Sequence, residues 1–544
     1  MSAAEDQNIR GSVGDRLGNN QLRVYLSNKS ETSKSIINKP VEKYIPYDIL
    51  KNKKIKVSLV SPSITIPKGM SKRCIPPLGL LYIASYLLRK NIDVSLYDCV
   101  VEGYNNEEHG ENNLMTYGVS PEDAAKTILE KKPNVVGMSV LFSTDLHNLV
   151  KLCAEIKKTD RNVLIIVGGL HPTIYPSDIW NICENEKGEK IIDFIIRGEG
   201  EKRLYDFILD LTAGKVNIKM DGLCGSVKGG VYFSNHQIET IQDLDSLPFP
   251  AYNLLPMEKY FSINVPFSPV PQGKRVMQIM TSRGCPVGCS FCASSNMYKK
   301  YRVRSVENVI NEIKQLKDTY HIDEIQFADD NIFFNKKRSI NLFKKLSFID
   351  VIWCTPNGVM VNTLSEELLN IFKYSGLYQI TLSIDSGSSN TLKNLQHKPV
   401  KLNTIPGLVK RCNELGIFSH GTLVVGLPGE TIDDINEGFD FVNDLELTSI
   451  SVFIASAIPG SELYHQALES GVITKERANK INTTKSDIHL SDISSEKLET
   501  IVMNFQYQFS ENVKIKNPEM WEKKYGNLIE KSKKFDDNFG GRLT

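Results

Sequence analysis

The stretch TSRGCPVGCSFCAS, residues 281–294, sets three cysteines in the spacing C-x3-C-x2-C directly after a short apolar run. Three thiolates within eight residues can bind three irons of a cubane iron–sulfur cluster, and the fourth iron then stays open to another ligand. A structural zinc site wants four ligands in paired spacings, and the sequence has no second pair of this kind. Isolated core cysteines are the remaining alternative, but glycines and a proline flank these three. The predicted cluster ligands are Cys285, Cys289 and Cys292.

A series of strand and helix patterns extends outward from this stretch. Six short apolar runs are the expected strands: 276–281, 324–330, 351–357, 378–385, 419–429 and 450–460. Six strand–helix units are fewer than the eight of a closed barrel, so the pattern predicts a partial, TIM-like (β/α)6 barrel. Within it, Thr363 and Glu366 are expected to form a capping box, and Thr431 is expected to cap a later helix.

The first half of the chain alternates in the same way. Its apolar runs are nearly continuous, which is typical of parallel strands covered on both faces, and they lie at 54–63, 94–99, 134–142, 162–169 and 193–200. Helical stretches such as 77–90 and 145–158 lie between them. This α/β pattern predicts a doubly wound, Rossmann-like parallel sheet. Ligands of such sheets bind at the carboxyl ends of the strands, and here those ends are small, polar and Gly-rich.

These patterns divide the chain into five segments. A polar leader (1–53), which we expect to be flexible or loosely packed, precedes the N-terminal domain (54–210). A connector rich in Pro and aromatic residues (211–273) leads to the partial barrel (274–465). A charged helical segment with a polar tail (466–544) follows.

The composition of the 544 residues argues against several classes of protein. Lys and Arg number 65 and Asp and Glu 64, so the net charge is +1 and no basic surplus favours a nucleic-acid binder. No apolar run reaches the ~18 to 20 residues that span a bilayer, and the first residues lack an apolar signal segment. Seven of the ten cysteines are scattered, which favours a reducing cytoplasm with one thiolate site.

The cysteine spacing after the first strand of a six-unit partial barrel resembles the radical S-adenosylmethionine superfamily. In that family the open iron of a 4Fe–4S cluster binds S-adenosylmethionine, which is cleaved to a 5′-deoxyadenosyl radical. The resemblance implies that Phe291 packs on the adenine. It also implies contacts at later strand ends, although Asp329 and Asp330 stand where many members have Gly-Gly-Glu, and Asp385 stands where Glu is usual. These further S-adenosylmethionine residues are Ala328, Asp329, Asp330, Ser383, Asp385, Ser386, Gly426 and Leu427.

The N-terminal sheet, with RCIPPLGL (73–80) in its first loop and helix, resembles the cobalamin-binding subfamily of these enzymes. The family loop D-x-H-x-x-G, which supplies a lower-axial histidine, is absent from residues 54–210, and only a partial echo occurs at 487–489. We therefore expect the corrinoid to be held without a histidine ligand, and His171 is either a ligand or an ordinary packing residue. A nucleotide or flavin site is the alternative, but G-x-G-x-x-G is missing after the first strand. The implied cobalamin contacts are Leu78, Gly79, Ser139, Gly168, Gly169, Gly198, Glu199 and Gly200.

The resemblance implies methylation of an unactivated sp3 carbon, with cobalamin carrying the methyl group. It also implies a small-molecule substrate and an external electron donor of the flavodoxin or ferredoxin type. The charge balance and the lack of long apolar runs predict neither a nucleic-acid nor a membrane partner. Within the subfamily, the chain is similar to enzymes that methylate a nucleotidylylated phosphonate in antibiotic biosynthesis of the fosfomycin type. The matching stretches include EGYNN (102–106), MEKYF (257–261) and SAIPGSEL (456–463).

Two other functions stay open at this point. One is a cobalamin-dependent radical enzyme that cyclises or rearranges its substrate without methylation, and the other is a corrinoid or iron–sulfur carrier without enzymatic activity. No side chain stands out as a general base. Polar and basic residues after the cysteines either bind an anionic substrate or form a solvated surface. They are Tyr298, Lys299, Lys300, Arg302 and Arg304.

Overall fold

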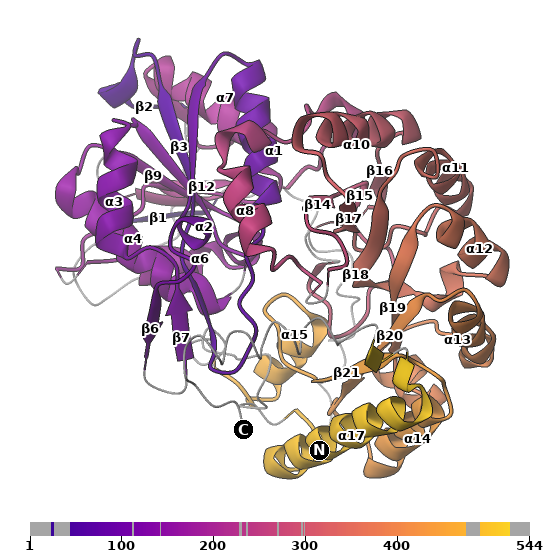
Figure 1. Ribbon diagram of the computed structural model, residues 1–544. Coiled ribbons are helices and arrows are strands. Elements are labelled where there is room, and N and C mark those ends of the chain that lie inside the picture. Colours follow the sequence, from indigo (N-terminus) through magenta and orange to yellow (C-terminus); the bar gives the residue numbers. More distant parts are fainter. Residues whose placement is uncertain are drawn as a thin grey trace, which may run out of the picture.

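The computed structural model describes residues 23–26, 44–110, 114–141, 143–185, 187–227, 231–235, 238–268, 271–294, 298, 300–474, 490–519 and 521–522. Figure 1 shows two α/β units side by side, the first in indigo to magenta and the second in rose to yellow. Each unit is built on its own sheet of mainly parallel strands. The fold class predicted from the alternation of short apolar strands and helices is therefore confirmed.

The first unit contains an eight-stranded sheet in the order β1-β13-β12-β10-β9-β8-β3-β5. Its last five strands are parallel and coincide with the five predicted runs. Their bounds are β3 (Lys56–Ser61), β5 (Asp93–Asp98), β8 (Val135–Ser139), β9 (Leu164–Gly168) and β10 (Phe194–Ile196).

Helices cover both faces of this sheet, which explains why its strands are apolar along their whole length. One face packs against α1 (Leu78–Arg89) and α7 (Gly200–Thr212) through residues such as Leu80 and Phe207. The other face packs against α3 (Pro121–Glu130) and α4 (Leu146–Thr159) through Ile128 and Leu149. Two short helices, α5 (Leu170–Ile174) and α6 (Pro176–Ile182), follow β9.

Several short strands join this unit from segments that the sequence pattern left outside the N-terminal domain. β12 (Leu223–Val227), β13 (Val231–Ser234) and β1 (Arg23–Leu26) extend the sheet with antiparallel pairs, and β2 (Tyr44–Pro46) pairs with β11 (Lys215–Asn217). Their sequences mix polar and apolar residues and lack the nearly continuous apolar run of the predicted strands, one of which, β10, is itself only three residues long. The rest of the leader up to residue 43 lies outside the described residues.

A small three-stranded sheet, β4-β7-β6, and the connector helix lie beside the main sheet. The strands are β4 (Ile64–Pro67), β6 (Glu107–His109) and β7 (Leu114–Tyr117), and the helix is α8 (Met257–Ile263). The Tyr260 hydroxyl of α8 donates to Asp98 at the end of β5, and the Tyr252 hydroxyl donates to the Gln278 carbonyl of the second unit (2.9 Å). The connector thus bonds to both units.

The second unit contains a six-stranded parallel sheet in the order β14-β17-β18-β19-β20-β21. Among the described residues no ladder joins β14 to β21, so the sheet is a partial barrel, as six units predict. Figure 1 shows its helices along the outer face. The strands are β14 (Val276–Ile279), β17 (Glu324–Phe327), β18 (Ile352–Met360), β19 (Leu377–Asp385), β20 (Phe418–Val425) and β21 (Ser449–Ile454). The helices are α10 (Val306–Tyr320), α11 (Lys336–Leu346), α12 (Glu366–Tyr374), α13 (Ile405–Glu414) and α14 (Ile432–Asn443).

The two predicted helix caps differ in outcome. Thr431 caps α14 in a capping box with Asp434, so that prediction is confirmed. The capping box of Thr363 with Glu366 is wrong, because α12 is capped by Ser365, whose hydroxyl accepts from Leu368 N (3.3 Å). Thr363 lies in a preceding 3-10 turn and donates to the Met360 carbonyl (2.6 Å).

The C-terminal segment packs against one edge of the barrel sheet, at β21. The last long helix, α17 (Ser495–Lys516), covers the edge strand β21, where Gln506 accepts a hydrogen bond from Val452 N (2.9 Å). Phe505 of α17 stacks on Phe439 of α14 with ring centroids 3.8 Å apart. A covered edge offers no free backbone groups for strand addition. No helix in the described residues combines the length and the apolar character needed to cross a membrane.

Candidate active site

The cysteine loop follows β14, and a pair of short strands joins its two ends. β15 (Ser282–Arg283) pairs antiparallel with β16 (Arg302–Val303), and the two strands bracket the loop. Gly284 has φ +90°, and a Cβ there would lie 2.7 Å from the Lys300 carbonyl oxygen. Only glycine fits this crossing, which explains the glycine directly before the first cysteine.

Ser290, in the middle of the loop, attaches it to two other loops at the mouth of the barrel. Its amide donates to the Gln396 carbonyl (3.1 Å) and its hydroxyl to the Leu395 carbonyl (2.7 Å). The Leu463 amide donates to the Ser290 carbonyl (3.1 Å). These partners follow β19 and β21, so the loop is held at the carboxyl ends of the strands, where ligands of such barrels bind.

The three predicted cluster ligands are partly exposed, whereas the other seven cysteines are buried. Burial raises the pKa of Cys289 to about 12, with Lys398 opposing this and the charges of Asp385, Cys292 and Cys285 adding to it. Burial also raises the pKa of Cys285, and nearby Asp330 and Cys292 add to it. The thiols are near enough to disfavour one another's thiolate forms, and a bound metal cluster would reverse that preference.

The arrangement of donors fits a cluster better than a single metal ion. In the part of the chain that the structure describes, no three His, Cys, Asp or Glu side chains converge on one ion. A structural zinc site needs such convergence. The thiolates of a cubane each bind a different iron, so they need not converge, and a partly exposed loop leaves room for the fourth iron and its ligand.

The end of β17 is one of the places where the resemblance implies contacts with S-adenosylmethionine. Its two carboxylates, Asp329 and Asp330, lie in different surroundings. Asp329 is buried and accepts hydrogen bonds from Thr281 N (3.0 Å), the Thr281 hydroxyl (2.7 Å) and the Ser282 hydroxyl (2.5 Å). Burial raises the pKa of Asp329, with these hydrogen bonds opposing. Its carboxylate fixes the strand that leads into the cysteine loop. Asp330 is exposed, and the Ala328 carbonyl accepts from Asn357 (3.1 Å).

The end of β19 carries a buried ion pair that the sequence did not reveal. Asp385 has φ +63° at a register shift, and its carboxylate pairs with Lys398 and accepts from the Thr422 hydroxyl (3.0 Å). Lys398 is 8% exposed and interacts electrostatically with Cys289 and Cys285. No local pattern marks a lone lysine in a polar loop. The neighbouring Ser383 and Ser386 lie half-buried and buried at the same strand end.

The turn after β20 brings Phe291 and Leu427 together. Leu427 is fully buried in a small apolar cluster, and Phe291 from the cysteine loop packs against that cluster. The Glu430 carboxylate accepts from the amides of Gly426 (2.5 Å) and Leu427 (3.2 Å) and so fixes the turn. Burial raises the pKa of Glu430 to about 7, with these backbone hydrogen bonds opposing.

The first unit contains a cavity of about 60 Å³ at the carboxyl ends of its parallel strands. Glycines form much of the wall of this cavity, and Leu80 and Ile83 of α1 cover the cavity. A Cβ at Gly200 would lie 2.8 Å from Ile83 Cδ1, and one at Gly168 would lie 3.3 Å from the Ile196 carbonyl. A part of the corrinoid could approach the backbone closely here. The predicted cobalamin residues that line it are Ser139, Gly168, Gly169, Gly198 and Gly200.

The other predicted cobalamin residues lie elsewhere. Leu78 is buried and Gly79 exposed at the start of α1, and neither lines the cavity. The Glu199 side chain points into the second unit and pairs with Arg283 and Arg302. His171 is buried in α5 with its ring 6.0 Å from that of Tyr175, and burial lowers its pKa to about 4.

The basic residues after the cysteines are mostly engaged. Arg302 and Arg304 are buried in ion pairs with Glu199 and Glu312, so the structure does not offer them as surface ligands for a substrate phosphate. Tyr298 is half-buried beside Arg302, 5.6 Å from its guanidinium carbon to the ring centroid. Lys300 is exposed. Lys299 and the partial histidine motif at 487–489 lie outside the described residues.

Known proteins are similar to this chain along most of its length. Residues 279–442 match the family model of the radical SAM superfamily, and residues 66–208 match that of the B12 binding domain. The cytidylyl-2-hydroxyethylphosphonate methyltransferase of Streptomyces wedmorensis is 33% identical over 80% of this chain and 85% of that protein. An uncharacterised methyltransferase of Pyrococcus horikoshii is 30% identical over 80% of this chain and 87% of that protein.

Solved structures share the fold. The radical S-adenosylmethionine methyltransferase TsrM from Kitasatospora setae, with cobalamin and a 4Fe–4S cluster bound, has a TM-score of 0.59 at 17% identity and covers 77% of this chain and 79% of that one. The cobalamin-dependent radical enzyme OxsB with aqua-cobalamin bound has a TM-score of 0.57 at 19% identity over 78% of this chain and 56% of that one. The cofactors of this chain are a 4Fe–4S cluster, S-adenosylmethionine and cobalamin. The chain belongs to the cobalamin-dependent radical S-adenosylmethionine methyltransferases.

Proposed function

We propose that this enzyme methylates an sp3 carbon of a nucleotidylylated phosphonate, with its cluster held by Cys285, Cys289 and Cys292. One observation carries the assignment of the site. The loop with the three partly exposed cysteines lies at the barrel mouth, and buried ion pairs join its base to the turn that lines the glycine cavity. Two cofactor sites joined in this way suit a reaction that needs a radical and a methyl donor at one substrate.

S-adenosylmethionine would bind across the cysteine loop and the neighbouring strand ends. Phe291 and Leu427 offer an apolar surface for the adenine. The exposed Asp330 carboxylate lies close enough to Cys285 to raise the pKa of that thiol. This carboxylate suits the ammonium group of the methionine moiety. Lys398, although paired with Asp385, lies close enough to Cys289 and Cys285 to interact with them electrostatically, so its ammonium group suits the carboxylate of the methionine moiety. Ala328, Ser383, Ser386 and Gly426 complete the wall of this site.

Cobalamin would bind at the carboxyl ends of the first sheet. The cavity wall contains Gly198 and Gly200, which let part of the corrinoid reach the backbone. Ile83 of α1 covers the cavity. The buried ring of His171 is neutral at physiological pH because its pKa is low, and we assign it a packing role. When bound, the three cofactors supply the radical and the methyl group. The residues of the chain bind and orient them and exclude water.

The substrate class rests on similarity to the relative from Streptomyces wedmorensis, whose name gives cytidylyl-2-hydroxyethylphosphonate. Such a substrate is anionic. Because Arg302 and Arg304 are committed to ion pairs, exposed Lys300 at the end of the cysteine loop is the cation we assign to it. We further propose a cytoplasmic location, where the thiols stay reduced, and an electron donor of the flavodoxin or ferredoxin type.

The test is an anaerobic assay of the reconstituted enzyme with S-adenosylmethionine that carries a deuterated methyl group. With cytidylyl-2-hydroxyethylphosphonate and a reductant, we expect a product heavier by one deuterated methyl group in place of hydrogen. A Lys300→Ala variant should raise the KM, and Lys274→Ala, which changes a lysine away from the cysteine loop, serves as the matched control. Formation of 5′-deoxyadenosine without transfer of the label would instead support the non-methylating alternative. Label transfer to other acceptors alone would overturn the proposed substrate.

A further inference from the structure

The turn between β10 and α7, residues 198–201, presents different groups to two parts of the molecule. Gly198 and Gly200 line the glycine cavity of the first unit. Glu199 and Glu201, only 4% and 3% exposed, direct their carboxylates into the second unit. The same four residues therefore border the proposed cobalamin site and contact the barrel.

The partners of these carboxylates are the two arginines at the base of the cysteine loop. Arg283 on β15 donates to Glu199 (2.8 Å) and to Glu201 (2.7 Å). Arg302 on β16 donates to both Glu199 oxygens (2.9 and 3.0 Å). Because β15 and β16 bracket the loop, the turn holds the loop at the points where it leaves and rejoins the barrel.

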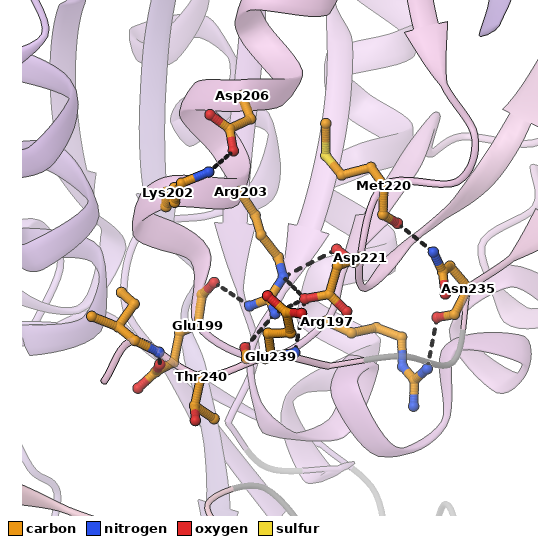
Figure 2. Close-up of polar contacts among 12 residues, drawn as sticks. Arg197, Glu199, Lys202, Arg203, Asp206, Met220, Asp221, Asn235, Glu239 and Thr240 are labelled. Atoms are coloured by element: carbon orange, nitrogen blue, oxygen red, sulfur yellow. Dashed lines mark hydrogen bonds and ion pairs between the residues drawn. The ribbon is translucent and has the colours of Figure 1, made fainter. Parts of the chain in front are cut away.

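The turn itself is fixed within the first unit. Figure 2 shows Arg203 between the backbone of Glu199 and the Asp221 carboxylate. Arg203 donates to the Glu199 carbonyl (2.7 Å), and the Ile241 amide donates to the Glu199 carboxylate (2.5 Å). With its carbonyl and its carboxylate both held, Glu199 has little freedom to follow the arginines if they move.

Buried ion pairs of this kind add little to stability relative to apolar contacts, because both charges lose their hydration. They do impose geometry, because removal of one partner leaves the other charge buried and unpaired. A reaction at one carbon between a radical source and a methyl donor depends on such geometry, since a displacement of about 1 Å can cost on the order of 100-fold in rate.

We infer that Glu199 is a positioning residue that sets the cluster loop relative to the bound corrinoid. The inference rests on the proposed assignment of the cluster to the cysteine loop and of cobalamin to the glycine cavity. It adds a role for a residue that the family resemblance implied as a cobalamin contact. In this role Glu199 acts through Arg283 and Arg302 and not on the substrate.

The experiment compares Glu199→Gln with Glu312→Gln in the full-length enzyme loaded with cluster and cobalamin. Glu312 on α10 pairs with Arg304 within the second unit, and the side-chain exposures of that pair, 5% and 1%, equal those of Arg302 and Glu199. Both variants therefore remove one carboxylate charge from an equally buried pair. The Glu199 carboxylate itself pairs across the two units, whereas the Glu312 carboxylate pairs within the second unit and reaches the first only through Arg304, which also donates to the Tyr82 hydroxyl of α1 (3.2 Å). Arg302→Lys, which keeps the charge and loses the planar fork, is the second variant of the interface.

Three readouts separate positioning from general destabilisation. They are the affinity for cobalamin by absorbance titration, the magnetic coupling between cob(II)alamin and the reduced cluster by electron paramagnetic resonance, and the ratio of 5′-deoxyadenosine to methylated product. For Glu199→Gln we expect normal cobalamin affinity, a broadened or weakened coupling, and a ratio raised on the order of 10- to 100-fold. Arg302→Lys should shift the coupling in the same direction. Glu312→Gln should keep the wild-type coupling and ratio.

Two results would overturn this inference alone. One is wild-type coupling and ratio in both Glu199→Gln and Arg302→Lys, and the other is an equal change in Glu312→Gln. If Glu199→Gln does not fold, Arg302→Lys decides by the same criteria. A wild-type enzyme that binds neither cluster nor cobalamin would instead overturn the proposed function, so the two failures are distinguishable.

Discussion

At the residue scale, the three loop thiols differ from the other cysteines of the chain by their partial exposure, and Cys289 lies close enough to Cys285 and Cys292 to interact with both electrostatically. Replacement of Cys289 by Ala removes one of three cluster ligands, so we expect loss of most iron and acid-labile sulfide after anaerobic reconstitution. Cys412→Ala is the control, because Cys412 is buried in α13 and its removal leaves only a small cavity. A full iron content in Cys289→Ala would contradict the assignment.

The glycine cavity can be tested by filling it. A Leu side chain at position 200 would extend toward Ile83 and occupy the proposed cobalamin site, since even a Cβ there lies 2.8 Å from Ile83 Cδ1. If the overlap of the added side chain with bound cobalamin costs as much as overpacking does in a core, roughly 1–3 kcal/mol of binding free energy, the cobalamin dissociation constant rises roughly 5- to 150-fold. Absorbance titration measures this change. The double variant Gly200→Leu/Ile83→Ala should recover part of the affinity, and no loss in the single variant would exclude cobalamin from this cavity.

Residue roles were predictable where the signal is local in the sequence. The cysteine spacing and the glycines at strand ends are contained in short stretches, and the structure places these residues in one loop and one cavity. The actual contacts of Asp329 and Glu199 were not predictable, because their partners lie 48 and 84 residues away in the chain. Lys398 was missed because burial beside Asp385 leaves no mark in composition.

At the element scale, the turn before α14 contains a buried acid with a raised pKa. In the unfolded chain the Glu430 carboxyl ionises near its ordinary pKa of 4.5, whereas in the folded chain it ionises at about 7 because burial disfavours its charge. Between these values the unfolded state releases the proton first, so this group makes stability fall as pH rises, by about 3 kcal/mol in total.

Glu430→Gln should remove this fall, because the amide does not ionise. Urea unfolding at about pH 5 and about pH 8 measures the difference in free energy of unfolding between the two conditions. We expect the wild-type enzyme to lose more stability than the variant between these conditions. An identical loss in both proteins would show that Glu430 does not titrate in this range.

The start of α12 offers a test of which residue caps the helix. Ser365→Ala should destabilise the protein by about 1 kcal/mol, because it leaves the Leu368 amide without its acceptor. Thr363→Ala should cost less, because the Thr363 hydroxyl donates to a carbonyl in a turn outside the helix. Chemical unfolding of the two variants measures both values, and a larger loss in Thr363→Ala would contradict the assignment of the cap.

Most elements were predictable because strands and helices of ordinary length repeat an apolar pattern. The five parallel strands of the first unit and the six of the second follow from this pattern. The added antiparallel strands β12, β13 and β1 did not, because polar residues interrupt their apolar residues and leave no continuous apolar run. The cap at Ser365 lay two residues from the predicted one, where several capping residues compete.

At the scale of the whole molecule, two α/β units each supply one proposed cofactor site, and several contacts join them. Among them are the connector tyrosines at 252 and 260, the buried pairs between 199–201 and the cysteine loop, a hydrogen bond from Arg304 to the Tyr82 hydroxyl (3.2 Å), and one from the Gly460 amide to the Tyr175 hydroxyl (3.0 Å). The relative placement of the units was not predictable from sequence, since it depends on side chains far apart along the chain.

The central claim is that the cysteine loop carries the cluster that cleaves S-adenosylmethionine. The most direct measurement is the formation of 5′-deoxyadenosine by the reduced, anaerobically reconstituted enzyme, compared with the triple variant Cys285→Ala/Cys289→Ala/Cys292→Ala. The wild-type enzyme should form 5′-deoxyadenosine, and the triple variant should form none above the background of the reductant. Equal formation by the two proteins would contradict the claim.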